Sequence, residues 1–443
     1  MTSIQFAKDG WFGVISDEIN FENMTIIAQG VADYLNESCD TSASVVIGYD
    51  TRFLSREYAW AIQQVLTGNR IRVFFHKKPA PTSFLSLSAR LYKADLGIMV
   101  TGKGRPARYS GMVFRSSQGR PLGRDFLSSL FNHLYRRYPR AADENRDLLT
   151  YIDVSKAYMD LLSGLITIKR PGPKMPLVIS DSCFGSVGGY IKDILRHYGF
   201  NTIAIRTKPN PGFMDCVPYP SPRNMQPTFR LIQQRHGQIG LFFSGDGSSL
   251  GVIDSRGHIV PDQWVSAIVL KEWLDLAGED YKVYTDIFTP SISVPILSYR
   301  GLAVRAPMYE LFEQTEQEEE TESYIVWDRQ SIYCSDFIPD RDAMFQAMVF
   351  VSALVRHEYD WDTMLAGLLR ITGMRTFLYR SIKLNKNIWS RKKTLLESYG
   401  RIGSLGNIID MQEEDEDLKL WMMDGSWAGL SYNSAEDHLS MYY

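Results

Sequence analysis

A short, positively charged loop is the first candidate for chemistry in this sequence. Residues 101–111 read TGKGRPARYSG, which places Lys103, Arg105 and Arg108 close together beside glycines. Guanidinium, ammonium and backbone N–H groups all donate hydrogen bonds to anions. The segment therefore indicates a candidate anion-binding site made by these three residues.

A second loop with glycines covers residues 244–250, which read SGDGSSL and place Asp246 among three serines. The four cysteines and seven histidines are scattered, and this pattern does not favour a zinc site.

Both loops follow short apolar runs that predict buried strands, over residues 96–100 and 239–243. Similar runs predict strands over 45–49, 71–75, 176–180, 202–206 and 281–284. Amphipathic spacing predicts helices over 23–35, 56–66, 83–92, 189–198, 264–277 and 342–357. Such alternation favours α/β units whose sheets are covered by helices. The charged stretch 136–149 is expected to be a helical linker, and the pattern becomes more polar after about residue 372.

Three motifs in order then resemble the alpha-D-phosphohexomutases, the phosphoglucomutase and phosphomannomutase relatives. They are FAKDGWFG at residues 6–13, GYDTRFLSRE at 48–57 and PAPT at 79–82. The resemblance implies a four-domain α/β architecture of three tandem mixed-sheet α/β domains and a short C-terminal α+β domain. The implied domains are 1–148, 149–257, 258–372 and 373–443.

The family's catalytic loop carries a phosphoserine, and here Lys103 occupies that position. Lysine has no hydroxyl that could carry a phosphate ester, so the resemblance implies that the nucleophile is missing. No catalytic residue is expected. We hypothesise that the Lys103 ammonium lies near the carboxylate of Asp246 and takes the place of a metal cation.

The other family sites are changed as well. The family's metal loop supplies three aspartates, of which only Asp246 remains, between Ser244 and Ser248. We therefore expect no cofactor, with Mg²⁺ binding lost or weak. The degenerate sugar-loop positions are Arg329, Gln330 and Ser331, within WDRQSIY at 327–333, whose bulky residues are expected to occupy the space of a sugar. The degenerate phosphate-loop positions are Ser431, Asn433, Ser434 and Ala435, within SYNSAED at 431–437.

Composition bounds the remaining function classes. The chain has 443 residues, 44% of them hydrophobic and 22% charged, with a formal net charge of -3. These values exclude a small disulfide scaffold or a disordered tail protein and do not favour nucleic-acid binding. No stretch resembles a membrane span or a secretory leader. The expected location is cytoplasmic, with bacterial cytoplasm and plastid interior equally open, and no membrane insertion is expected.

The resemblance and the substitutions together predict a catalytically inactive phosphohexomutase-like protein, a pseudoenzyme acting as a scaffold or regulatory subunit through protein contacts. Aromatic residues are enriched in interface hot spots, although most are expected to be core residues. The candidate interface anchors are Trp327, Tyr333, Trp421, Tyr432, Tyr442 and Tyr443. Two alternatives stay open: a sugar-phosphate sensor that uses the 103–108 loop, and a residual mutase phosphorylated at Thr101 or Ser110.

Overall fold

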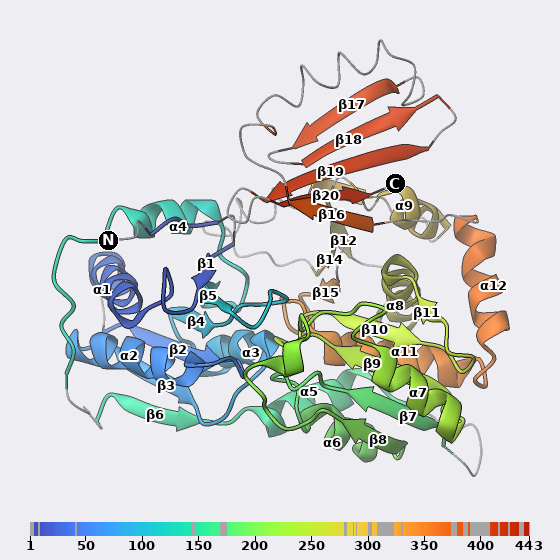
Figure 1. Ribbon diagram of the computed structural model, residues 1–443, viewed down its shortest axis with the longest axis horizontal. Coiled ribbons are helices and arrows are strands. Elements are labelled where there is room, and N and C mark those ends of the chain that lie inside the picture. The colour runs from blue at the N-terminus through green and yellow to red at the C-terminus, as the bar shows by residue number, and fades with distance from the viewer. Residues whose placement is uncertain are drawn as a thin grey trace.

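The structure is a computed structural model of the whole chain. It describes residues 4–7, 9–39, 42–142, 147–168, 175–278, 281–286, 288, 290–299, 304–307, 323–328, 331–373, 379–383, 389, 408–414, 417–423, 426–433 and 438–442. Its described strands form four sheets, which Figure 1 shows as three helix-covered units and a C-terminal sheet that stands above them. The predicted α/β fold class is confirmed. None of the helices in the described ranges is long and apolar enough to cross a membrane.

The first sheet is mixed and has the order β1-β5-β4-β2-β3-β6. Its strands and helices are β1 (Trp11–Val14), α1 (Phe21–Ser38), β2 (Ser44–Tyr49), α2 (Ser55–Gly68), β3 (Arg72–His76), α3 (Thr82–Tyr92), β4 (Leu96–Val100), β5 (Tyr109–Ser116), α4 (Arg124–Phe131) and β6 (Leu149–Ile152). Strands β2, β3, β4 and β6 run parallel. Because β6 pairs with β3, the expected boundary between residues 148 and 149 falls immediately before the last strand of this sheet.

The expected helical linker over residues 136–149 is wrong for the residues that the structure describes. Residues 136–142 form no helix, and β6 begins at Leu149. The stretch has many charges but lacks the apolar spacing of an amphipathic helix. Hydrogen bonds to neighbouring helices hold it instead: the N–H of Arg140 donates to Oε1 of Gln29 on α1, and the N–H of Ala142 donates to the carbonyl of Gln64 on α2.

The second sheet has the order β11-β10-β9-β7-β8. The elements of this unit are α5 (Ser155–Leu165), β7 (Leu177–Asp181), α6 (Tyr190–His197), β8 (Asn201–Ile205), the short 3₁₀ helix η1 (Phe213–Asp215), α7 (Gln226–Arg235), β9 (Ile239–Phe243), β10 (Leu250–Ile253) and β11 (Ile259–Val260). Strand β9 is fully buried, as its unbroken apolar sequence predicts. Strand β11 lies beyond the expected boundary at residue 257 and still pairs with β10.

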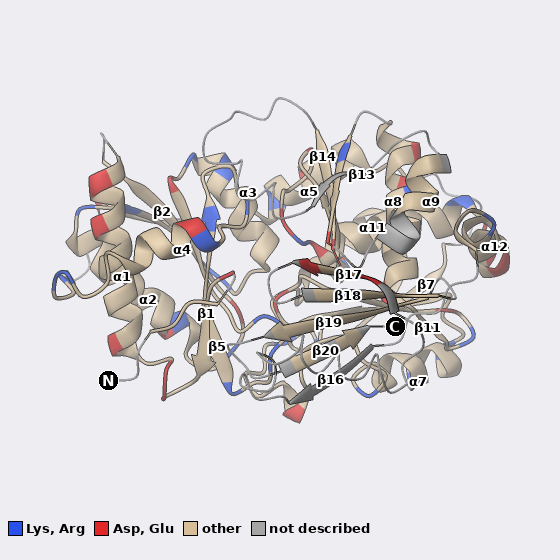
Figure 2. Cartoon of the chain, turned by 90° about the horizontal axis from the view of Figure 1, so that it is seen from above, with Lys and Arg blue, Asp and Glu red and all other residues tan. Residues whose placement is uncertain are grey.

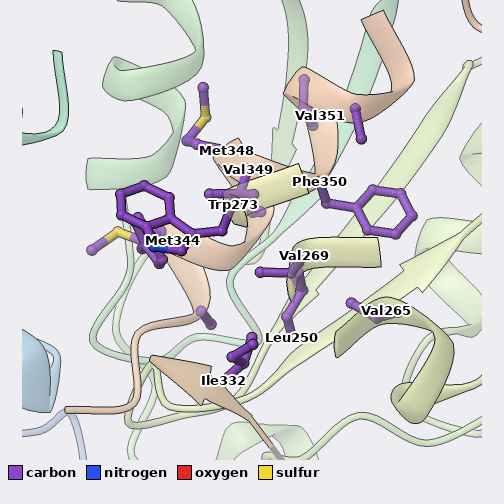
Figure 3. Close-up of a cluster of buried hydrophobic side chains, with 14 of the residues drawn as sticks. Leu250, Val265, Val269, Trp273, Ile332, Met344, Met348, Val349, Phe350 and Val351 are labelled. Carbon is purple, nitrogen blue, oxygen red and sulfur yellow. The ribbon is translucent and has the colours of Figure 1, made fainter. Parts of the chain in front are cut away.

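The third unit combines a small sheet, of order β13-β12-β14-β15, with long buried helices. Its elements are α8 (Asp262–Ala277), β12 (Lys282–Thr285), α9 (Pro290–Tyr299), β13 (Val304–Pro307), β14 (Tyr324–Trp327), β15 (Ile332–Cys334), α11 (Ala343–Arg356) and α12 (Trp361–Thr372). Figure 3 shows side chains of α8 and α11 meeting Leu250 of β10 and Ile332 of β15. One hydrophobic core therefore joins the second and third units.

The described residues of the fourth domain form an antiparallel sheet of order β16-β20-β19-β18-β17. Its strands are β16 (Tyr379–Lys383), β17 (Ile408–Glu414), β18 (Asp417–Met422), β19 (Trp427–Asn433) and β20 (His438–Tyr442). The ring of Trp427 stacks on Phe288 of the third unit with centroids 5.9 Å apart. This contact docks the sheet beside β12. Figure 2 shows basic and acidic residues interspersed along the described parts of the chain.

Candidate functional site

A buried arginine organises the loop that follows β4. Arg52 comes just after β2, and its side chain is 0% exposed. Its Nε donates to Oδ2 of Asp50 (3.1 Å). Its two terminal nitrogens donate to the carbonyls of Lys103 (2.6 Å), Arg105 (2.8 Å), Pro106 (2.8 Å) and Tyr109 (2.9 Å). Burial lowers the pKa of Arg52, and the charges of Asp50 and Asp246 oppose that shift.

Asp50 holds the same loop from its other side. It accepts hydrogen bonds from the hydroxyls of Thr101 (2.8 Å) and Ser55 (2.7 Å), and from the N–H of Gly102 (3.3 Å). The hydroxyl of Thr101 in turn accepts from the N–H of Lys103 at 2.9 Å. The loop conformation is therefore set by backbone and buried groups rather than by the side chain of Lys103.

Lys103 projects from this loop with φ of 52°, in the left-handed region. Its ammonium forms an ion pair with the carboxylate of Asp9, and the two side chains are 19% and 49% exposed. Burial would raise the pKa of Asp9, but Lys103, Arg105 and Arg341 reverse that effect and hold the pKa well below its usual range. Burial lowers the pKa of Lys103, and Asp9 opposes this. The hypothesised pair of Lys103 with Asp246 is wrong.

The other two predicted anion-binding residues lie on the same loop but are directed differently. The guanidinium of Arg105 lies 3.7 Å from the ring centroid of Phe12, which is a close cation–π contact. Arg108 is exposed, with its guanidinium 5.4 Å from the ring centroid of Tyr109. The ammonium of Lys103 also lies 5.6 Å from the ring centroid of Phe12, so the structure brings the three cations together on one loop and two of them over the same ring.

The second candidate loop, after β9, is closed by its own hydrogen bonds. Oδ1 of Asp246 accepts from the hydroxyls of Ser244 (2.7 Å) and Ser248 (2.9 Å), and from the N–H of Ser248 (3.2 Å). The hydroxyl of Ser244 accepts from the N–H groups of Ser248 and Ser249. Asp246 is 1% exposed and Ser244 is 0% exposed. Within the part of the chain that the structure describes, no group of three or more His, Cys, Asp or Glu could hold a metal ion.

Both loops lie where the first three domains join. The carbonyl of Asp246 accepts from the N–H of Thr82 at the start of α3, and the carbonyl of Gly247 accepts from the N–H of Ala343 at the start of α11. The ring of Tyr219 lies against Gly104, where a Cβ atom would approach its Cδ2 within 2.8 Å. Domains I, II and III thus each contribute to this junction.

Sequence reasoning missed the buried ion pair that fastens domain I to domain III. Nε and Nη2 of Arg115 on β5 donate to the two carboxylate oxygens of Asp340 at 2.7 and 3.1 Å. The hydroxyl of Ser86 on α3 also donates to Asp340 at 2.7 Å. A buried arginine in a strand is a sign that a carboxylate partner exists, but sequence alone could not identify a partner 225 residues away.

The sugar-loop positions lie only partly within the described residues. Arg329 and Gln330 fall outside them. Ser331 is 0% exposed, and its hydroxyl accepts from Nε2 of Gln346 on α11 at 2.9 Å. Its N–H donates to Asp328, which pairs with Arg341 (Nε to Oδ2, 2.8 Å). Ser331 is therefore tied into the interior of domain III.

The bulky residues around Ser331 belong to the core. Trp327 is 1% exposed, Ile332 3% and Tyr333 4%. Burial raises the pKa of Tyr333 well above its usual value. The expectation that Trp327 and Tyr333 are interface anchors is wrong, and the same holds for Tyr432, which is 3% exposed.

The predicted phosphate-loop positions also lie only partly within the described residues. Ser431 is half-buried on β19, where it lies opposite Asp417 of β18 and Ser440 of β20. Asn433 ends β19. Ser434 and Ala435 lie outside the described residues, as does Tyr443. Trp421 is half-buried, and the Lys419 ammonium lies 4.3 Å from its ring centroid.

Comparison with known proteins identifies this architecture. Residues 3–138 match the family model for phosphoglucomutase/phosphomannomutase, alpha/beta/alpha domain I, and residues 156–257 match the model for domain II of the same family. The two matches together span more than half of the chain. A phosphoglucomutase of Staphylococcus haemolyticus is 29% identical over 237 residues, which are 51% of this chain and 43% of that relative. The match thus spans less than half the length of that relative.

Two solved structures share the fold over nearly the full chain. One, from Thermus thermophilus and assigned as a phosphomannomutase, has a TM-score of 0.81 at 20% identity, covering 100% of this chain and 95% of that chain. A phosphoglucomutase/phosphomannomutase family protein from Burkholderia thailandensis has a TM-score of 0.75 at 16% identity, covering 99% and 93%. The fold defines a multi-domain α/β protein of the phosphohexomutase architecture. This chain belongs to the alpha-D-phosphohexomutase family.

Proposed function

We propose that this chain is a phosphohexomutase-family protein without mutase activity, which acts as a scaffold or regulatory subunit through protein contacts. The observation that carries the proposal is the ion pair of Lys103 with Asp9, at the position where the family resemblance implies a phosphoserine. A mutase needs a group at this position that can accept and return a phosphoryl group. An ammonium already engaged by a carboxylate does not supply that chemistry.

The two alternative hydroxyls of this loop do not replace the missing nucleophile. Thr101 and Ser110 are both 0% exposed. The hydroxyl of Thr101 also donates to Asp50 and accepts from the N–H of Lys103. Phosphorylation of either residue would place a dianion in the interior, where an unpaired charge is costly. This argues against a residual mutase that uses them.

The second loop argues against a metal-assisted reaction. Mg²⁺ would have to compete with two serine hydroxyls and one N–H for Oδ1 of Asp246, and no second carboxylate of the loop would neutralise its charge. Hard divalent cations are held by several oxygen ligands that include carboxylates. The donor set does not fit the family's metal ion.

A scaffold role is favoured because buried side chains hold the loops and domains around the site in one arrangement. Arg52 holds four loop carbonyls in place, and the Arg115–Asp340 pair is buried between domains I and III. A buried ion pair is weak evidence of added stability, and we hypothesise that this pair instead fixes the arrangement of domains I and III. A rigid shell that has lost a nucleophile is suited to presenting surfaces to a partner.

A coupled mutase assay tests the loss of activity. The purified chain is incubated with glucose 1-phosphate or mannose 1-phosphate, Mg²⁺ and the hexose bisphosphate activator, and its intact mass is measured in parallel. We expect no turnover above the blank and no added phosphate, while the Staphylococcus haemolyticus phosphoglucomutase, assayed alongside, turns over. Turnover that scales with the amount of protein and disappears in Asp246→Ala would overturn the proposal.

The second candidate function is a sugar-phosphate sensor. It is favoured by the exposed Arg108 beside Lys103 and Arg105 on one loop. Calorimetry with glucose and mannose phosphates at millimolar concentration decides between the two functions. Heat that saturates in the wild type and is lost in Arg108→Ala supports the sensor, whereas no heat from either sugar phosphate excludes it.

A further inference from the structure

Domain I carries three exposed aromatic side chains within one short segment. This segment, residues 131–140, begins at the last residue of α4 and reads FNHLYRRYPR, and we call it the Tyr/Arg segment. Phe131 is 54% exposed, Tyr135 55% and Tyr138 96%. Aromatic rings are normally among the better buried side chains. Three rings this exposed within one short segment indicate a contact surface.

The segment is held rigidly against α1 although its rings face solvent. Leu134 is 7% exposed and belongs to the core of domain I. Nε2 of His133 lies 2.9 Å from Oε2 of Glu37, and Nδ1 lies 2.7 Å from the carbonyl of Ser129. The ring of His133 also meets Tyr34 edge-on, with centroids 5.7 Å apart. A segment fixed before binding loses less conformational entropy when a partner arrives.

The same segment carries an excess of positive charge. Arg136 is shared between the carbonyl of Asn132 (2.7 Å) and the carboxylate of Glu37 (3.1 Å). Nη1 of Arg137 lies 3.8 Å from Asp33, and its side chain is 73% exposed. The side chain of Arg140 is exposed as well. Two carboxylates thus face three guanidinium groups, and most of the charge of Arg137 remains available to solvent and partners.

We propose that the Tyr/Arg segment is a docking site for an acidic, extended segment of a partner protein. Tyrosine and arginine are the residue types that dominate protein-interface hot spots, and the three guanidinium groups select acidic side chains by charge complementarity. The inference rests on the proposed scaffold function and names the chemistry of its partner. The partner's carboxylates pair with Arg137 and Arg140, while its apolar side chains pack on Tyr135 and Tyr138.

A protein segment is favoured over a nucleic acid because the surrounding field is not basic. Glu37 and Asp33 lie directly beside the arginines, and the whole chain carries a formal charge of -3. Nucleic-acid binding depends on releasing counterions from many phosphates, which needs a broad basic surface. Here the positive charge is confined to one short segment between acidic neighbours.

Fluorescence anisotropy with defined probes tests the proposal. The probes are a fluorescein-labelled dodecapeptide of alternating Glu and Leu, the same peptide with Gln in place of Glu, and a twelve-nucleotide oligo-dT. The full chain is titrated into each at low and at 0.5 M salt. We expect saturable binding of the acidic peptide that weakens with salt, and binding at least about tenfold weaker to the Gln peptide and to oligo-dT.

Variants then locate the site. We expect Tyr138→Ala and Arg137→Ala each to weaken the acidic peptide at least about tenfold, as for hot-spot residues. Tyr151→Ala, at a ring 44% exposed on β6, and Arg235→Ala on the surface of α7 serve as controls that leave binding unchanged. Both segment residues make few internal contacts, so their variants should fold, which circular dichroism checks.

Four outcomes overturn the proposal: no saturable binding of the acidic peptide, equal binding of the Gln peptide, tighter binding of oligo-dT, or binding that survives both segment variants. The result is independent of the mutase assay, which uses the same protein without peptide. Peptide binding together with mutase turnover would reject the loss of activity and keep the docking site. If neither peptide binding nor turnover is observed, only the docking site is rejected.

Discussion

The loops 101–109 and 244–250 lie at the same junction but are held by different means. The first is fixed by a buried cation, Arg52, which donates to four of its carbonyls. The second is fixed by uncharged serine hydroxyls gathered on the carboxylate of Asp246. In the first, the side chain of Lys103 takes little part in holding the loop. In the second, the hydroxyls of Ser244 and Ser248 hold the loop themselves.

This difference indicates that the two loops depend on their side chains to different degrees. Loop 101–109 depends little on the side chain of residue 103, because backbone groups and the Arg52–Asp50 pair maintain it. Loop 244–250 needs small hydrogen-bond donors at residues 244 and 248, since Asp246 would otherwise be a buried charge with few partners. The comparison predicts unequal costs for matched substitutions in the two loops.

The largest effect is expected for Arg52→Met. The change leaves Asp50 buried without its cation and removes the donors of four loop carbonyls, so we expect a loss of about 3–5 kcal/mol in the free energy of unfolding. Urea denaturation followed by circular dichroism measures it. Arg56→Met, at an exposed position on the following helix, is the matched control and should change stability by less than about 0.5 kcal/mol. Equal effects of the two variants would mean that Arg52 does not hold the loop.

The next largest effect on stability is expected at Asp342, whose neighbour Ala343 donates a hydrogen bond to the second loop. Asp342 is 1% exposed and caps α11. Burial raises its pKa to about 6, although the hydroxyls of Tyr158 and Ser83 and two N–H groups lower it. Because the folded pKa lies above the unfolded value of 3.8, stability falls as pH rises from about 4 to about 6 and stays lower above that. Asparagine also caps helices, so Asp342→Asn should be more stable than wild type at pH 7, by about 1–3 kcal/mol.

The helix-capping Asp360 serves as a control whose pKa is shifted in the opposite direction. It is exposed, and hydrogen bonds from Thr363 lower its pKa. Its contribution is therefore present above about pH 4 and is lost as pH falls further. Asp360→Asn should weaken the fold slightly at pH 7. Thermal melts between pH 3 and pH 8 compare the two variants, and an Asp342→Asn protein that is less stable than wild type at pH 7 would contradict the assignment.

Many of the strands and helices around this junction could be predicted from the sequence, but the contacts between the domains could not. The expected strands over 96–100 and 239–243 are confirmed residue for residue as β4 and β9, because a fully apolar run bounded by glycine-rich loops leaves little choice of structure. The loops that follow them were located for the same reason. The expected helix over 136–149 is not found in the described part of that stretch, since its charges carried no periodicity.

The partners of the charged residues were not predictable because they come from distant parts of the chain. Lys103 pairs with Asp9, 94 residues away, rather than with Asp246. Local spacing specifies which residues share an element, but not which loops of different domains meet. The burial of Trp327 and Tyr333 was missed for a related reason. Trp327 is interior because it joins the core that contains α8 and α11, whereas Tyr333 packs with Tyr284 and Tyr324 in a separate buried cluster. Residue type alone does not distinguish an interface ring from a core ring.

A smaller effect is expected for Asp246→Ala in the second loop. The change removes the acceptor of two hydroxyls and one N–H, so the free energy of unfolding should fall by about 1–3 kcal/mol. Asp246→Asn keeps Oδ1 as an acceptor and should recover at least half of the loss. Urea denaturation distinguishes the two variants. An Asn variant as unstable as the Ala variant would show that the charge of Asp246, and not its hydrogen bonds, fastens the loop.

The smallest effect is expected for Lys103→Met in the first loop. The ion pair with Asp9 is partly exposed, so its removal should change the free energy of unfolding by less than about 1 kcal/mol at pH 7. The lowered pKa of Asp9 means that the pair contributes above about pH 4 and that its contribution is lost as pH falls through the lower, folded pKa. Lys78→Met removes the exposed pair with Asp153 (3.7 Å) as a control. If Lys103→Met lowered the free energy of unfolding as much as Arg52→Met, residue 103 would be part of what holds its loop. The distinction between the two loops would then be removed.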